Sequence, residues 1–379
     1  MCSSDLWGRP AIQVAFTIFV LAETWLVPLE GYLVDRYGPR VVVVLAGLLV
    51  GGAWMINSVA HSLTLLYIGA LVAGIGAGGV YGTCVGNALK WFPDRRGLAA
   101  GLTAMGFGAG SALTVSPIAD MIATRGYEAT FLTFGIIQGT VIFLLGWILK
   151  APPAGFAVAA KAGVVAPAPA RDYTPGQMVR TPAFWVMYAM FVMMSTGGLV
   201  ATAQLTPIAN DYQISAIQVS LLGLTYPALK FALAIDRVMN GVSRSMFGWV
   251  SDQIGREHTM LLAFTLEGVS LLLLDRFGRD PTAFVVLTAM VYLCWGEIYS
   301  LFPATTADTY GRKYAAANYG LMYTAKGTAS LLVPLSSIVA ASSGGWHAVY
   351  LVAAAMNLVS AVMAFWVLKP MRIRMKAAG

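Results

Sequence analysis

Arg244 is the residue whose charge and position most directly suggest chemistry. It lies eight residues before Asp252 in a predicted helix, so its guanidinium sits about 12 Å inside the helix end. The apolar core of a bilayer is about 30 Å thick, and an Arg near its middle costs roughly 2.5–3.5 kcal/mol. A charge at that depth normally faces a polar interior and serves a function. The alternative is a structural ion pair with a nearby acid such as Asp236.

Lys326 is a second cation at similar depth, fourteen residues after Arg312 and thus about 21 Å along a helix. Two cations on two helices suit a planar dianion with a carboxylate at each end. Arg offers a forked set of donors and Lys a compact charge. Trp295 and Tyr299 are four residues apart, so we expect them to share a helix face. Aromatic rings there would exclude water and strengthen the charge pairs, although each ring can equally be a packing residue.

Acidic residues also fall within the apolar runs, at Glu23, Asp236, Glu267 and Glu297. Glu297 lies between the two aromatic residues just named, so we expect it close to the cations. It can supply counter-charge there, or accept a proton and couple transport to it. For Glu23 and Asp236 the expectation is a pair with Arg237 or a place facing the cavity.

The composition places these residues in a membrane protein. The 379 residues are 58% hydrophobic and 11% charged, whereas soluble domains carry about 25% charged residues. We therefore predict an all-α polytopic membrane protein. Eleven apolar runs are long enough to cross a bilayer, with the shortest at 258–274. They lie at about 12–34, 41–60, 64–88, 98–122, 129–149, 183–205, 217–250, 258–274, 282–304, 315–341 and 345–368.

Other classes of function have no support in the sequence. The three cysteines are scattered and the three histidines fall in predicted connections, which argues against a disulfide framework or a metal site. No nucleophile–base pair or phosphate-binding loop stands out, so we predict no enzyme and no cofactor. The net charge of +7 is explained by membrane topology and does not indicate nucleic-acid binding.

Basic residues set the predicted orientation. If the loop at Asp35–Arg40 is cytoplasmic, 16 of the 24 Lys and Arg residues lie inside, four outside and four within spans. This bias predicts a cytoplasmic C-terminus. The Pro-, Gly- and Ala-rich segment 150–182 is predicted to be a flexible cytoplasmic linker between an N-terminal half, 1–149, and a C-terminal half, 183–379. No signal peptide is apparent at the N-terminus.

The two halves carry matching loops. Asp252 lies 217 residues after Asp35, and Arg312 lies at the same offset from Arg95. Two matching turns at one offset indicate a parallel repeat. Asp252 ends the second span of its half, but Asp35 ends the first span, so the sequence predicts that one helix is missing before Ile12. The intact protein would then have twelve.

The matching loops follow the pattern Gly-x-x-x-Asp-x-x-Gly-Pro/x-Arg. It resembles the signature loop of the major facilitator superfamily, which implies two pseudo-symmetric six-helix halves. Physically, the pattern suits a tight Gly turn with an Asp near a helix N-terminus and an Arg near a C-terminus. Its members here are Gly31, Asp35, Gly38 and Arg40 in the first half, and Gly248, Asp252, Gly255 and Arg256 in the second.

Four longer motifs resemble the bacterial oxalate–formate antiporter family, and the resemblance covers nearly the whole chain. They are Trp91-Phe-Pro-Asp-Arg-Arg-Gly-Leu-Ala-Ala-Gly101, Asn240-Gly-Val-Ser-Arg244, Trp295-Gly-Glu-Ile-Tyr-Ser-Leu-Phe-Pro303 and Tyr323-Thr-Ala-Lys-Gly-Thr-Ala-Ser330. The resemblance implies that Arg244 and Lys326 hold a dicarboxylate. It also implies that aromatic residues line the binding site. Phe107 is at a lining position where a family member can carry Tyr. The other lining residues would be Tyr81, Trp295, Tyr299 and Tyr323.

The expected function is exchange of extracellular oxalate for intracellular formate by alternating access in a bacterial inner membrane. The expected partners are these small organic anions and the lipid bilayer, and we expect a monomer. The alternative is a proton-coupled monocarboxylate symporter on the same fold, suggested by Glu297. A sensor that binds its ligand without transporting it is a third hypothesis from a different class.

Overall fold

The chain folds into two compact units made almost entirely of helices. The computed structural model describes residues 9–153, 171–221 and 223–377. Unit 1 consists of Met1–Asp94, Gly110–Met178 and Thr306–Gly327, and unit 2 consists of Arg95–Ala109, Val179–Thr305 and Thr328–Gly379. The units are defined by packing, whereas the two predicted halves are defined by the sequence repeat. Most of the predicted linker, 154–170, lies outside the described residues, as do residues 1–8 at the start of the chain.

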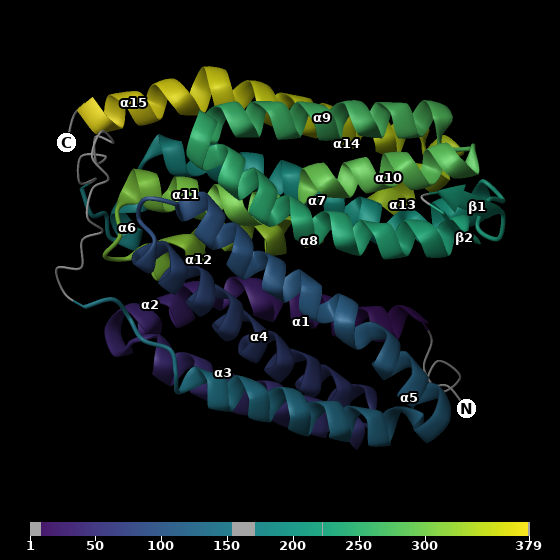
Figure 1. Ribbon diagram of the computed structural model, residues 1–379, viewed down its shortest axis with the longest axis horizontal. Helices are drawn as coiled ribbons and strands as arrows, with labels where there is room; N and C mark the ends of the chain where they lie inside the picture. The colour runs from purple at the N-terminus through teal and green to yellow at the C-terminus, as the bar shows by residue number, and fades with distance from the viewer. Residues whose placement is uncertain (1–8, 154–170, 222, 378–379) are drawn as a thin grey trace. The chain divides into compact units, whose positions relative to one another are not determined.

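Unit 1 is organised around α4, a helix with a row of glycines. Both α3 and α1 pack along α4, as Figure 1 shows. Gly74 and Gly78 allow the approach of α1, because a Cβ at Gly78 would lie 2.5 Å from the carbonyl oxygen of Glu23. The helices of this unit are α1 (Arg9–Trp25), α2 (Val27–Tyr37), α3 (Pro39–Ser58), α4 (Leu63–Trp91), α6 (Pro175–Met178), most of α5 (Arg96–Gly146) and α12 (Ala315–Ser330), and the end of α11 (Ile298–Tyr310).

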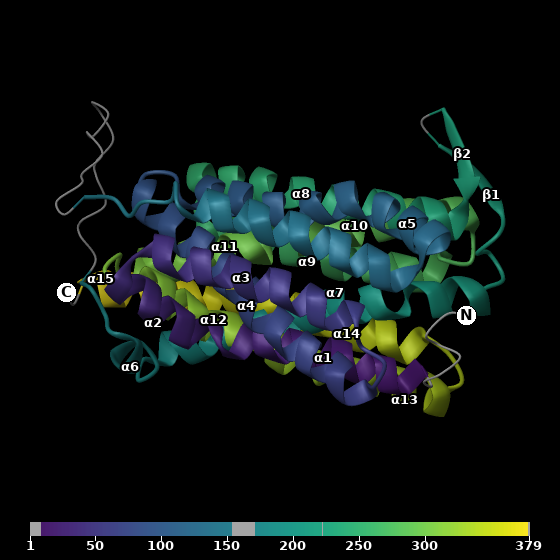
Figure 2. The same cartoon turned by 90° about the horizontal axis from the view of Figure 1, so that it is seen from below.

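Unit 2 holds a second bundle, in which α9 packs against α10 and α14, and α10 also packs against α8. A short antiparallel hairpin of β1 and β2 leads directly into α8 and is seen from a second side in Figure 2. The elements of this unit are α7 (Pro182–Asp211), β1 (Gln218–Leu221), β2 (Leu224–Pro227), α8 (Ala228–Ile254), α9 (Arg256–Phe277), α10 (Pro281–Trp295), α13 (Val333–Ser343), α14 (His347–Val362), η2 (Met363–Leu368), α15 (Lys369–Ala377) and the first turns of α5 and α11.

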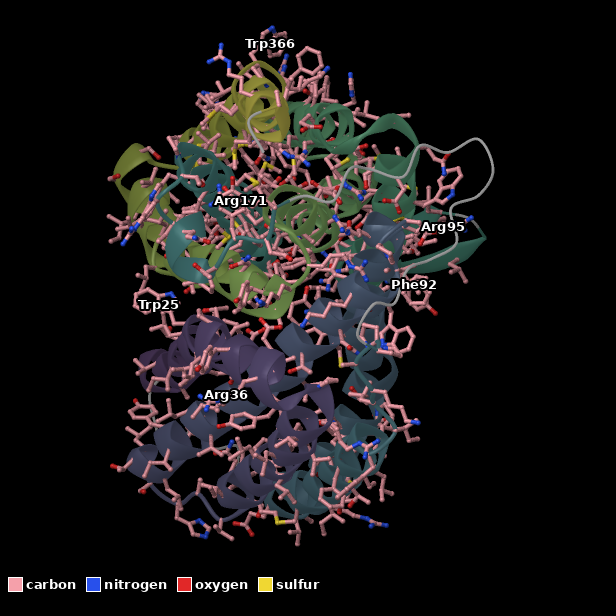
Figure 3. All side chains as sticks on the ribbon, turned by 90° about the vertical axis from the view of Figure 1, so that its left-hand side faces the viewer. Trp25, Arg36, Phe92, Arg95, Arg171 and Trp366 are labelled. Atoms are coloured by element: carbon pink, nitrogen blue, oxygen red, sulfur yellow. The ribbon has the colours of Figure 1, made fainter. Side chains whose placement is uncertain are left out.

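The predicted all-α membrane class is confirmed. Eight helical stretches among the described residues are long and apolar enough to cross a bilayer. Helices also occupy the other predicted runs, although α8 and α9 carry more charged residues than those eight. Apolar side chains face outward, as expected for contact with lipid: Trp366 of η2 is 60% exposed and points away from its unit in Figure 3.

One predicted boundary is wrong and several runs are interrupted. The run 217–250 does not begin as a helix, because residues 218–227 form the β-hairpin and α8 starts only at Ala228. The long helix α5 is divided at Gly126, whose φ of 80° separates the predicted runs 98–122 and 129–149. Breaks before α2 and α13 each precede a proline in the first turn, which cannot donate a backbone hydrogen bond to the preceding helix.

Close approach of α5 and α8 within unit 2 generates a stability prediction. A Cβ at Gly101 would overlap the carbonyl oxygen of Arg244, whereas a Cβ at Gly106 on the same helix meets no atom within 4 Å. Alanine is favoured over glycine in a helix by about 1 kcal/mol, but overpacking costs about 1–3 kcal/mol. The net cost is then about 1 kcal/mol at the middle of that range, so we expect Gly101→Ala to lower the Tm of the purified protein by roughly 2–4 °C.

Gly106→Ala is the matched control, and its Tm should equal or exceed that of the unmodified protein in a thermal unfolding assay in detergent. Equal Tm values for the two variants would contradict the close packing of α5 on α8.

Candidate functional site

Arg244 is held in unit 2 by partners that carry no negative charge. Its side chain is buried, and it donates hydrogen bonds to the carbonyl oxygen of Ala104 at 2.9 Å and to Oδ1 of Asn240 at 2.7 Å. The guanidinium carbon lies 4.3 Å from the centre of the Tyr299 ring. Asp236, considered as a structural partner, has no hydrogen-bond partner for either carboxyl oxygen among the described residues. Arg244 is therefore oriented without a neutralising carboxylate from Asp236.

Two predicted aromatic residues lie beside this cation. The rings of Trp295 and Tyr299 meet edge to face with centres 5.7 Å apart, and both side chains are buried. The chain makes a turn at Gly296 and Glu297 between α10 and α11, but Gly296 keeps right-handed helical angles, with φ −63° and ψ −23°. The two rings therefore remain in contact, as their spacing predicted. Arg244, Tyr299 and Trp295 thus form a continuous cation–aromatic cluster in unit 2.

Lys326 has a different environment in unit 1. Its Nζ lies 3.1 Å from each carboxylate oxygen of Glu23 and donates to the hydroxyl of Tyr323 at 3.0 Å. That hydroxyl in turn donates to Oε1 of Glu23 at 3.1 Å. The Glu23 side chain is 3% exposed and that of Lys326 12% exposed. Lys326 is therefore neutralised by a buried carboxylate contributed by α1.

Tyrosine rings extend the Lys326 cluster. The ring of Tyr81 lies 5.1 Å from that of Tyr323, so these two predicted lining residues are brought together. Tyr319 joins them, with its hydroxyl 3.4 Å from that of Tyr81. Tyr319 was not predicted, although its position four residues before Tyr323 on one helix was a usable signal. All of these side chains are buried.

The two remaining predicted site residues differ in burial. Phe107 on α5 is 46% exposed. Glu297 is fully buried, and neither of its carboxyl oxygens has a hydrogen-bond partner among the residues that the structure describes. The acid that acts on it electrostatically is Glu267 of α9. Glu297 therefore supplies no hydrogen-bonded counter-charge to Arg244, and its predicted role in coupling remains a prediction.

The two signature loops adopt the same geometry. Gly38 and Gly255 occupy equivalent positions and have φ values of 87° and 93°, a region that favours glycine. Gly31 and Gly248 are equally well matched, since each lies against the backbone of another helix where a Cβ would clash. The parallel repeat predicted from the sequence is thus visible in the backbone.

The loop aspartates cap helix N-termini far away in the sequence. Asp252 accepts hydrogen bonds from the amides of Gly97 at 3.0 Å and Leu98 at 2.9 Å, in the first turn of α5. Asp35 accepts one from Ala317 at 3.2 Å, in the first turn of α12. A carboxylate there satisfies free amides and is favoured by the helix dipole.

The cations paired with these aspartates differ between the loops. Arg256 lies 2.6 Å from Asp252, whereas Asp35 pairs with Lys90 of α4 at 2.5 Å and Arg40 is exposed.

A bundle of apolar helices with buried cationic clusters and two equivalent glycine–aspartate loops defines a membrane transporter, and comparisons with known proteins agree. The family model described as Major Facilitator Superfamily matches residues 5–241 and 189–378. The chain belongs to that superfamily. It is 34% identical to the oxalate:formate antiporter of Oxalobacter formigenes over 362 residues, covering 95% of this chain and 83% of the relative. Within the superfamily, its place in the bacterial oxalate–formate antiporter family is therefore confirmed.

More distant matches agree with the fold. An uncharacterized MFS-type transporter of Escherichia coli (strain K12), YhjX, is 26% identical over 325 residues, covering 85% of this chain and 77% of the relative. The crystal structure of the superfamily transporter FucP in the outward conformation superposes with a TM-score of 0.70 at 14% sequence identity. That match covers 94% of this chain and 92% of the other.

The capping role of Asp252 is testable. In Asp252→Ala, two amides at the start of α5 lose their side-chain acceptor, and each unsatisfied buried group costs about 1–3 kcal/mol. The Arg256 guanidinium also loses its ion pair with this carboxylate. We expect a clear fall in Tm, with Asp120→Ala, an exposed acid on α5, as the control that leaves Tm unchanged. A Tm for Asp252→Ala equal to that of the control would show that the cap does not stabilise unit 2.

Proposed function

We propose that this protein exchanges extracellular oxalate for intracellular formate across the bacterial inner membrane by alternating access, with Arg244 and Lys326 binding the anion. The observation that carries the proposal is the environment of Arg244. A buried guanidinium whose contacts are a carbonyl, an amide and an aromatic ring has directed donors but no neutralising partner among those contacts. A carboxylate is the ligand that such a group binds best.

The guanidinium retains donors for a ligand. It has five N–H groups, of which two are used by Ala104 and Asn240, and its Nε has no partner among the described residues. Tyr299 and Trp295 shield the cation from water, which strengthens an ion pair with a bound carboxylate. Lys326, with its ring of tyrosines, offers a compact second charge. These features support recognition of a small, flat, doubly charged anion.

Obligatory exchange also has a physical basis in these contacts. A carrier with a buried cation and no anion is unfavourable, so return of the empty carrier is disfavoured and return with an anion is favoured. The relative from Oxalobacter formigenes is named an oxalate:formate antiporter, which supports this choice of substrates. We further infer a cytoplasmic C-terminus from the distribution of basic residues, and a monomeric carrier.

A proton-coupled monocarboxylate symporter is the second candidate, and the Lys326–Glu23 ion pair favours it. With Lys326 neutralised from within, Arg244 alone can bind a single carboxylate. Glu297, buried and without a hydrogen-bond partner among the described residues, would then carry the proton. This candidate requires formate uptake into empty vesicles, driven by an inward proton gradient and lost in Glu297→Gln.

The test is uptake of labelled oxalate by the purified protein in proteoliposomes that are either loaded with formate or empty. We expect uptake only into formate-loaded vesicles. Arg244→Gln and Lys326→Gln should each reduce it at least tenfold, because each removes a charge-assisted contact worth about 1.5–3 kcal/mol.

Arg374→Gln, which removes an exposed charge on α15, is the matched control and should transport normally. Equal uptake into loaded and empty vesicles would rule out obligatory exchange.

A further inference from the structure

The β-hairpin between α7 and α8 has one apolar face. Its strands pair Val219 with Tyr226 and Leu221 with Leu224. Cross-strand partners project from the same side of a sheet, and side chains alternate between the two sides along each strand. These four apolar side chains therefore share one face of the hairpin, which projects from one end of unit 2 (Figure 2).

The opposite face of the hairpin is polar. Ser220 and Thr225 are paired across the strands and exposed, and their hydroxyl oxygens lie 2.7 Å apart. Gln218 lies on the same face and is also exposed. One face of this short sheet therefore suits water, and the other suits an apolar medium.

The protein covers only part of the apolar face. Val219 is 2% exposed and belongs to the hydrophobic core of unit 2, and Leu221 packs against that core. Leu224 and Tyr226, in contrast, are 52% and 49% exposed. The apolar face therefore extends beyond the core that it helps to close.

The hairpin is fixed to the first residue of α8, and the length of that helix gives its depth. The amide of Ala228 donates to the carbonyl oxygen of Ile217 at 2.8 Å. Helix α8 has 27 residues and is therefore about 40 Å long. The hydrocarbon core of a bilayer is about 30 Å thick, and the bilayer with its headgroups is about 40–45 Å thick. When α8 spans the bilayer, its first turn and the hairpin lie at the level of the headgroups.

We propose that this hairpin is a membrane-interface anchor. Leu224 and Tyr226 contact lipids at the boundary between headgroups and acyl chains, while Ser220 and Thr225 face water. The anchor holds the first turn of α8, the helix that carries Arg244, at a fixed depth. The inference concerns contact with the bilayer and is independent of the substrate that is transported.

The interface suits the hairpin better than either hydrocarbon or water. A two-stranded sheet has two free edges, and the backbone groups on a free edge cannot be satisfied in hydrocarbon. Exposed apolar side chains such as Leu224 and Tyr226 are unfavourable in water. The interface supplies both media. Tyrosine is enriched there because its ring is apolar and its hydroxyl is polar.

Lipid fits the exposed part of the apolar face better than a protein partner does. A stable protein interface buries about 800 Å² on each partner, far more than the side chains of Leu224 and Tyr226 offer. A lipid contact has no such lower limit. Lys230 in the first turn of α8 is exposed, and its long side chain can place the ammonium group among the lipid phosphates at this depth.

Spin labels on adjacent residues test this placement. The three native cysteines are replaced by alanine, and a label is attached to Leu224→Cys or, as the matched control, to Thr225→Cys. Both residues are exposed, but they lie on opposite faces of the hairpin. Electron paramagnetic resonance in liposomes then measures collisions with oxygen, which is concentrated among acyl chains, and with a water-soluble nickel chelate. We expect oxygen collisions to dominate for Leu224→Cys and nickel collisions to dominate for Thr225→Cys.

The other outcomes would each overturn the proposal. Dominant nickel collisions for both labels would place the hairpin in water. Few collisions with either reagent for Leu224→Cys would show that protein covers the apolar face. Dominant oxygen collisions for both labels would place the whole hairpin among acyl chains, contrary to an interfacial position.

Quenching by brominated lipids tests depth and anchoring separately. A fluorophore on Leu224→Cys should be quenched more strongly by lipids brominated close to the headgroup than by lipids brominated near the end of the acyl chain. A fluorophore on Lys230→Cys should shift toward water when Leu224→Ser and Tyr226→Ser are combined, and it should not shift in the control Ser220→Ala. Stronger quenching of the first fluorophore by the deeply brominated lipids would contradict the interfacial depth. An unchanged depth of the second would overturn the anchoring of α8.

Discussion

A charge buried among apolar helices must be compensated, and this requirement governs the two clusters that the structure builds. Arg244 is compensated by dipoles and a ring: a carbonyl, an amide oxygen and the face of Tyr299. Lys326 is compensated by a full carboxylate, Glu23. Dipoles orient a cation without cancelling its charge, so Arg244 remains attractive to an anion. A carboxylate cancels the charge, so the Lys326 ammonium is neutralised within the protein.

The two signature loops that hold the helices together make the same kinds of contact. In each signature loop a glycine with positive φ makes the turn, and a second glycine permits backbone contact with another helix. The aspartate between them caps the start of a helix more than 150 residues away in the sequence. Such caps satisfy amides that would otherwise be free in an apolar environment, and they link distant parts of the chain within each unit.

Two buried acids, Glu267 and Glu297, contrast with both cationic clusters. Both side chains are fully buried, and the carboxyl oxygens of Glu297 have no hydrogen-bond partner among the described residues. Sequence position alone suggested that Glu297 would serve the substrate cations, because it lies between Trp295 and Tyr299. In the structure, the acid that acts on Glu297 electrostatically is Glu267 of α9. A position between two site residues in the sequence therefore did not identify the partner of this acid.

The sequence alone determined the membrane class, the repeat, the signature glycines and the two buried cations. These features depend on composition, on local backbone geometry or on helix rise, and each is encoded by residues close together in the chain. Tyr81 and Tyr323 were expected to be lining residues from the family resemblance alone, and their contact with each other was not predicted. The β-hairpin before Ala228 was missed, because its apolar residues read as the start of a helix.

Only the tertiary structure decided which acid meets which cation. Glu23 and Lys326 are 303 residues apart, and Ala104 and Arg244 are 140 apart. No local pattern encodes such contacts, because they arise when helices from distant parts of the chain pack together. For the same reason the ion pair between Glu23 and Lys326 could be recognised only once the fold was known.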